Sequence, residues 1–105
     1  MRPVLYADVV AAARALLALP EGQRRGKMQQ MLDQAAAADL YRKRLGRGHP
    51  LWGNGCLMAV ASRRPAPPEP FLDDPQYCQC LILVLETLLD WRAERAGRNQ
   101  PDTAI

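Results

Sequence analysis

The chain is 105 residues long, the usual size of one domain and enough to bury a single hydrophobic core. Hydrophobic residues make up 49% of it and charged residues 24%, a composition that excludes a disordered chain. The chain has 14 Lys and Arg and 11 Asp and Glu, so its formal charge is +3. The protein is therefore mildly basic, and this charge alone does not indicate which kind of partner it binds.

The cysteines and the N-terminal sequence predict a soluble protein of a reducing cytoplasm. An odd number of cysteines, with Cys78 and Cys80 only two positions apart, does not build the disulfide framework of a small secreted protein. The N-terminus has an acid at position 8 and lacks the apolar region of a signal peptide. The longest apolar run, residues 77–89, is interrupted by polar residues and is too short to cross a bilayer, so we expect no membrane association.

Apolar residues at helical spacing predict two helices in the first half of the chain. The first spans residues 5–19 and ends before a proline, which cannot continue it. The second begins weakly, because Gly22 and Gly26 lower its helix propensity, and then carries an apolar stripe to about Leu45. Gly46 follows as a left-handed cap.

The second half predicts two further helices separated by a proline-rich strap. Asn54 is a credible N-cap for a short helix over residues 55–63. Five prolines in residues 64–75 make the next segment stiff and extended. The pair Asp74 and Pro75 then combines an N-cap acceptor with a first-turn proline, so a helix should begin there.

The last helix is apolar around most of its circumference, and we therefore expect it at the centre of the others. Gly97 gives it a natural end. The fold class that follows is all-α: a single-domain bundle of about four helices over residues 1–97, with a proline-rich strap between helices three and four. Residues 98–105 form a frayed C-terminal tail.

Four segments of the chain are distinctive: residues 1–5 (MRPVL), 38–47 (ADLYRKRLGR), 49–53 (HPLWG) and 69–78 (EPFLDDPQYC). Together they resemble a family of small alphaproteobacterial proteins to which no activity, fold or ligand is assigned. The resemblance implies a bacterial, cytoplasmic setting and carries over no functional residue.

The segment over residues 42–55 is the strongest functional signal. It holds four of the seven glycines, the only histidine, one of the two tryptophans and four cations. Ordinary helix connections do not concentrate such residues, and binding residues are disproportionately found on loops. We therefore expect function to reside in this loop.

Half of all the cations lie in residues 24–47, where seven cations against two acids give a local charge of +5. Arginine binds phosphates bidentately, and Trp52 or Tyr41 could stack on a base, which together would suit nucleic acid. A helix-turn-helix is disfavoured, because a nine-residue glycine-rich loop joins the two middle helices. The seven cations are Arg24, Arg25, Lys27, Arg42, Lys43, Arg44 and Arg47.

Two other interpretations of these cations stay open. They could attract an acidic protein partner. Alternatively they form a solvated helix end that complements the helix dipole, with arginines paired to the strap's acids Glu69, Asp73 and Asp74.

The loop and its neighbouring cysteine also allow alternatives. Glycine amides of the loop could bind an anion, although the sequence matches no known phosphate-binding motif. In the competing interpretation the loop folds back onto the core, with Trp52 as an apolar plug and His49 as a hydrogen-bonded spacer. Cys56, in the first turn of the third helix and near His49, could be a nucleophile or redox sensor, or a small buried core residue. A zinc site built from Cys56, His49, Cys78 and Cys80 is disfavoured, because residues two apart on a helix, such as Cys78 and Cys80, point about 200° apart.

We predict a non-enzymatic interaction or regulatory module that binds an acidic protein partner, with nucleic acid as the alternative partner and a reactive thiol at Cys56 as the weakest alternative. We expect neither a cofactor nor a metal ion, and self-association stays open. The predicted partner-binding residues are Arg42, Lys43, Arg44, Arg47, His49 and Trp52.

Overall fold

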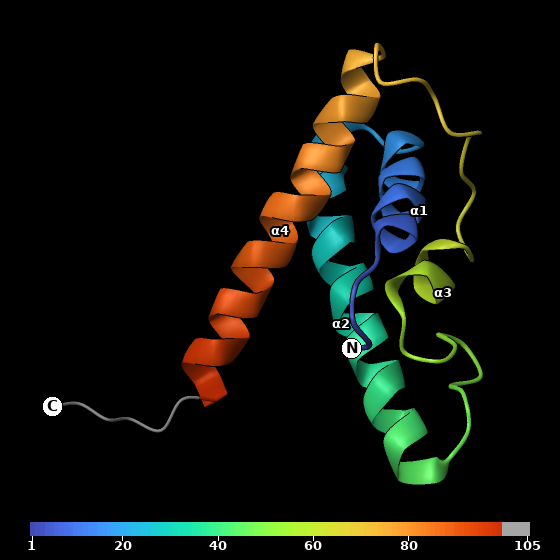
Figure 1. Ribbon diagram of the computed structural model, residues 1–105, viewed down its shortest axis with the longest axis vertical. Coiled ribbons are helices and arrows are strands. Elements are labelled where there is room, and N and C mark those ends of the chain that lie inside the picture. The colour runs from blue at the N-terminus through green and yellow to red at the C-terminus, as the bar shows by residue number, and fades with distance from the viewer. Residues whose placement is uncertain (100–105) are drawn as a thin grey trace, which may run out of the picture.

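A computed structural model describes residues 1–99, with the side chains of Arg98 and Asn99 excepted, and residues 100–105 of the predicted tail lie outside this range. Within the described range the chain forms four α-helices and no strand (Figure 1). The helices are α1 (Tyr6–Leu17), α2 (Glu21–Leu45), α3 (Leu57–Ala61) and α4 (Pro75–Asn99). The predicted all-α fold with a strap between α3 and α4 is confirmed. None of these helices combines the length and apolar character needed to span a bilayer.

Local chemistry sets the two helix ends that the sequence marks most strongly. α2 ends at Gly46, which adopts the left-handed conformation (φ +72°) and donates its amide to the carbonyl of Arg42 at 2.8 Å. α4 begins at Pro75 as predicted, and Oδ1 of Asp74 accepts the amides of Gln76 at 2.9 Å and Tyr77 at 3.3 Å.

The predicted start of α3 and the predicted end of α4 are wrong, and α1 and α3 each end two residues earlier than predicted. α3 begins at Leu57 rather than at residue 55, because Gly55 has a φ of +95° that no right-handed helix contains. Asn54 instead accepts the amide of Cys56 at 3.2 Å, and Cys56 is the N-cap residue. At the other end, α4 does not stop at Gly97 but continues to Asn99, since a solvent-exposed glycine only weakens a helix.

α4 is not the central helix of the bundle. Within the described range α1 and α2 each contact all three other helices, whereas α4 contacts only α1 and α2. Both α2 and α4 start at the same end of the molecule and diverge toward their C-termini (Figure 1). The prediction was wrong because an apolar circumference shows which residues can be buried, not which are; Ile82, Leu85 and Leu89 face solvent. The largest fully buried side chains are Tyr77, Leu16, Met28, Met31, Leu32, Leu57, Val60 and Val84.

Side chains of α1 and α4 hold the strap against the bundle. Arg14 donates from Nε to the carbonyl of Pro67 at 2.7 Å. The hydroxyl of Tyr77, a fully buried side chain, donates to Glu69 at 3.0 Å. Burial and this hydrogen bond to a carboxylate raise the pKa of Tyr77 to about 12. The strap therefore belongs to the packed structure and is not a free linker.

Gly26→Ala should stabilise the protein by about 0.5–1 kcal/mol, because Gly26 lies in α2 with nothing within 4 Å of an added methyl group. Urea unfolding of the variant measures this gain. Gly46→Ala is the matched control and should lose stability, since the left-handed conformation strains any residue with a Cβ. Equal effects of the two substitutions would contradict this assignment of the α2 end.

Candidate functional site

The loop between α2 and α3 is a tight, internally bonded turn. His49 and Gly53 exchange two backbone hydrogen bonds, of 2.8 and 3.0 Å. Nδ1 of His49 accepts the amides of Leu51 at 3.0 Å and Trp52 at 3.2 Å. The histidine thus closes the turn that presents Leu51 at its tip.

Aromatic packing fixes this turn on α2. The ring of His49 stacks on Trp52, with centroids 4.6 Å apart and planes at 7°, and meets the ring of Tyr41 edge-on at 4.8 Å. Trp52 is half-buried and packs against the hydrophobic core. This geometry favours the plug and spacer interpretation for Trp52 and His49.

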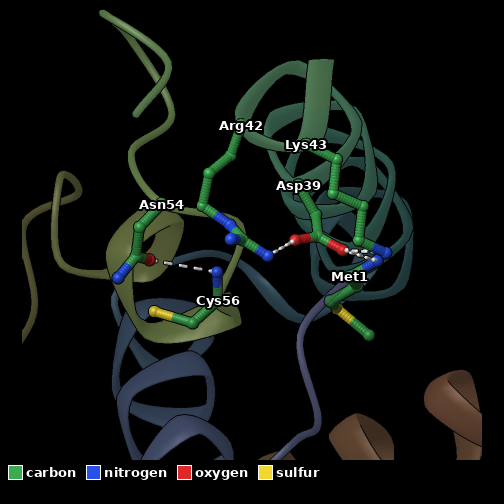
Figure 2. A network of polar contacts seen from close by, with 6 residues as sticks. All are labelled: Met1, Asp39, Arg42, Lys43, Asn54 and Cys56. Carbon is green, nitrogen blue, oxygen red and sulfur yellow. Dashed lines mark hydrogen bonds and ion pairs between the residues drawn. The ribbon is translucent and has the colours of Figure 1, made fainter. Parts of the chain in front are cut away.

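Beneath the loop lies a buried carboxylate, Asp39, that three cations surround (Figure 2). Oδ1 of Asp39 binds Arg42 at 2.8 Å, and Oδ2 binds Lys43 at 3.1 Å and the amino group of Met1 at 3.3 Å. Burial alone would raise the pKa of this carboxyl, but the hydrogen bonds from Arg42, Lys43 and the amino group outweigh burial and hold the pKa at about 2. Asp39 is therefore ionised at any pH near neutrality.

The end of the loop packs against the backbone of α2 at Asp39. A Cβ added at Gly55 would lie 2.6 Å from the Cα of Asp39, so the loop backbone packs directly on α2. The carbonyl of Gly55 also accepts the amide of Arg2 at 2.9 Å. The N-terminal segment, α2 and the loop thus meet around Asp39.

The structure separates the basic residues of the segment into two groups. Five of the seven have partners inside the chain. Arg24 donates to the carbonyls of Leu16 and Leu19 at the end of α1, Arg25 binds Asp90 at 2.7 Å, and Lys27 donates to Gln30 at 2.8 Å. Arg42 and Lys43 both bind Asp39. The expected pairing with the strap's acids is therefore wrong. The strap's acids Glu69 and Asp74 instead accept hydrogen bonds from Tyr77 and the start of α4.

Arg44 and Arg47 form the second group. Both are exposed, and within residues 1–99 neither side chain makes a hydrogen bond or an ion pair. Two exposed leucines, Leu45 and Leu51, belong to the same segment. We call Arg44, Leu45, Arg47 and Leu51 the basic tip.

Within residues 1–99 no hydrogen bond joins a cysteine to His49. Cys56 is the N-cap of a five-residue helix, not part of its first turn, and its thiol makes no hydrogen bond within the described chain. His49 already accepts two amides through Nδ1. Cys80 is buried, whereas Cys78 donates to the carbonyl of Leu72 at 2.9 Å. Over residues 1–99, no group of three or more His, Cys, Asp and Glu could hold a metal ion.

Comparison with known families places this site in a defined domain. A family model described as a domain of unknown function, DUF7742, matches residues 2–88. The chain belongs to this family. The DUF7742 match takes in Asp39, the loop and the basic tip, and it ends before the last eleven residues of α4. No curated protein and no solved structure matches the chain.

The structural roles of two buried acids of this DUF7742 chain, Asp39 and Asp8, were not predicted from the sequence. Asp39 lies on the apolar stripe of α2, three and four positions before Arg42 and Lys43, a spacing at which side chains meet on a helix. Asp8 accepts the amide of Leu5 at 2.7 Å and that of Met58 at 2.9 Å, so one carboxylate caps α1 and joins it to α3. The acid at the third position of α1 is the sequence feature from which this cap could have been predicted.

Proposed function

We propose that this protein is a non-enzymatic interaction module that binds an acidic protein segment through its basic tip, in the cytoplasm of a bacterium. The observation that carries the proposal is that Arg44 and Arg47 are exposed and without partners in the described chain, while the neighbouring cations are engaged. Three unpaired thiols support a reducing compartment.

The predicted residues act in two different ways under this proposal. Arg44 and Arg47 attract carboxylates and pair with them, and the exposed Leu51 of the same segment offers an apolar contact. His49 and Trp52 hold the turn in one conformation, so little conformational entropy is lost on binding. Arg42 and Lys43 add positive potential while their hydrogen bonds go to Asp39.

The double substitution Arg44→Glu/Arg47→Glu should weaken binding of a fluorescein-labelled peptide of alternating Glu and Leu by about tenfold or more, because it reverses both free charges. Fluorescence anisotropy at moderate salt measures the affinity. The matched control Arg2→Glu/Arg63→Glu changes the net charge equally at two exposed arginines elsewhere. Equal weakening by both pairs would show a general charge effect and contradict the site.

A nucleic-acid partner is tested with the same variants. The rings of Tyr41 and Trp52 are both engaged by His49, which leaves them poorly placed to stack on bases. A labelled single-stranded oligonucleotide should therefore show no retardation in a gel at low salt. If the wild type is retarded, if retardation falls steeply with added salt and if Arg44→Glu/Arg47→Glu abolishes it, the partner of the basic tip is nucleic acid and not an acidic protein.

A further inference from the structure

The residues of the proline-rich strap favour a polyproline II helix. Every residue from 64 to 70 is either a proline or the residue directly before one. Proline fixes φ at about −65°, and the residue before a proline avoids the α-helical region, so both favour the polyproline II conformation. Residues 65–71 accordingly form neither a helix nor a turn. Since this conformation has three residues per turn, side chains three positions apart lie on the same edge.

Exposure along the strap follows this period of three. The inner edge consists of Pro67 and Pro70, which are half-buried, and Arg14 of α1 donates to the carbonyl of Pro67 at 2.7 Å. The side chains of the two outer edges are all exposed: Pro65, Pro68 and Phe71 on one, and Ala66 and Glu69 on the other. One edge is therefore held against the bundle, and two edges face solvent.

Two overlapping Pro-x-x-Pro frames therefore differ in their accessibility. Pro67 and Pro70 face the bundle, whereas Pro65 and Pro68, which we call the outer frame, face solvent. Phe71 continues the outer frame and is 85% exposed, more than any other large hydrophobic side chain within residues 1–99. The carbonyls of Pro65 and Pro68 accept no hydrogen bond from this part of the chain, so a partner can donate to them.

Contacts within the chain hold the strap in this conformation. At its start, the guanidinium of Arg64 donates to the carbonyl of Val60 at 3.1 Å. Farther along, the hydroxyl of the buried Tyr77 donates to Glu69 at 3.0 Å. Because a segment already fixed in its bound conformation loses little entropy on binding, a preformed polyproline II helix is a favourable ligand for another protein.

We propose that the strap is a docking site for a partner protein whose aromatic-lined groove recognises a polyproline II helix. Such grooves bind Pro-x-x-Pro segments, and here the groove contacts Pro65, Pro68 and Phe71. Glu69 and Asp73 are exposed beside this frame, and the side chain of Asp73 has no partner within the described chain, so the groove has a basic rim. The strap leads to the start of α4, at the opposite end of the molecule from the basic tip, and the two sites are independent (Figure 1).

Binding of purified SH3, WW and EVH1 domains to the isotope-labelled full chain tests the proposal, because all three use aromatic-lined grooves for polyproline II segments. We expect saturable binding by at least one of these domains at micromolar concentration, with the largest amide chemical-shift changes at Ala66, Glu69 and Phe71. Binding by none of the three at high micromolar concentration, or shifts confined to other segments, would overturn the proposal.

Substitutions in the strap test which residues carry the binding. Pro68→Ala/Phe71→Ala should weaken it about tenfold or more with unchanged helical circular dichroism, because both side chains are exposed and neither belongs to the core. The matched control Pro50→Ala/Leu51→Ala removes an exposed proline and an exposed apolar residue from the other loop and should leave the affinity unchanged. Equal weakening by the two pairs would contradict the site. Asp73→Lys should weaken the binding several-fold, and an unchanged or tighter affinity would contradict the basic rim.

Discussion

Asp39→Asn should lower the free energy of unfolding by about 3 kcal/mol, the effect of removing one partner from a buried charge network. The buried carboxylate of Asp39 binds Arg42, Lys43 and the amino group of Met1, and the buried amino group would be left without its counter-charge. Chemical unfolding followed by circular dichroism measures the loss.

An exposed ion pair provides the control. Asp90 binds Arg25 at a similar distance, but both side chains are about half or more exposed to solvent. Asp90→Asn should therefore cost no more than about 0.5 kcal/mol. Similar losses from both substitutions would mean that the network around Asp39 does not stabilise the fold through buried charge.

The contribution of Asp39 should also depend on pH in a defined window. The pKa of this carboxyl is about 2 in the folded protein and 3.8 ordinarily, so its stabilising effect is fully present above about pH 4 and is lost as the pH falls toward 2. The stability difference between the wild type and Asp39→Asn should narrow over that window. A difference that stays constant from pH 7 to pH 2 would contradict the lowered pKa.

Gly55→Ala should cost about 3 kcal/mol or more and release the loop from α2. The residue has a φ of +95°, which strains any side chain, and the added methyl carbon would lie 2.6 Å from backbone and side-chain atoms of Asp39. Thermal unfolding measures the cost, and the amide signals of His49 and Gly53 report whether the turn loosens.

Gly48→Ala in the same loop is the control for this substitution. Its φ is not positive, and the nearest atoms to an added methyl group are 3.6 Å away, an ordinary contact. We expect a change within about 0.5 kcal/mol. If Gly55→Ala were equally mild, the loop would not be held against Asp39 in the way described.

Sequence reasoning succeeded where the physical cause is local. The cap at Gly46 and the helix start at Asp74 and Pro75 depend on neighbouring residues, and both are as predicted. It failed where the cause is tertiary. The apolar circumference of α4 could not show that Ile82 and Leu89 stay uncovered by this chain.

The same distinction applies to the candidate site. The sequence located the loop and its cations but could not assign their partners. Arg24 binds the end of α1 and Arg25 binds α4, and both contacts form only when the helices pack together. Asp39 was within reach, since its spacing to Arg42 and Lys43 is local, but its burial and its contact with Met1 depend on the packing of the chain.

The central claim is that the basic tip is a preformed and free surface for an acidic segment. Titration of the isotope-labelled protein with the peptide of alternating Glu and Leu, followed by amide chemical shifts, tests it directly. We expect the largest shifts at Arg44, Arg47 and Leu51, with the signals of His49 and Gly53 keeping their hydrogen-bonded character. Shifts confined to α4, or none at peptide excess, would contradict the account.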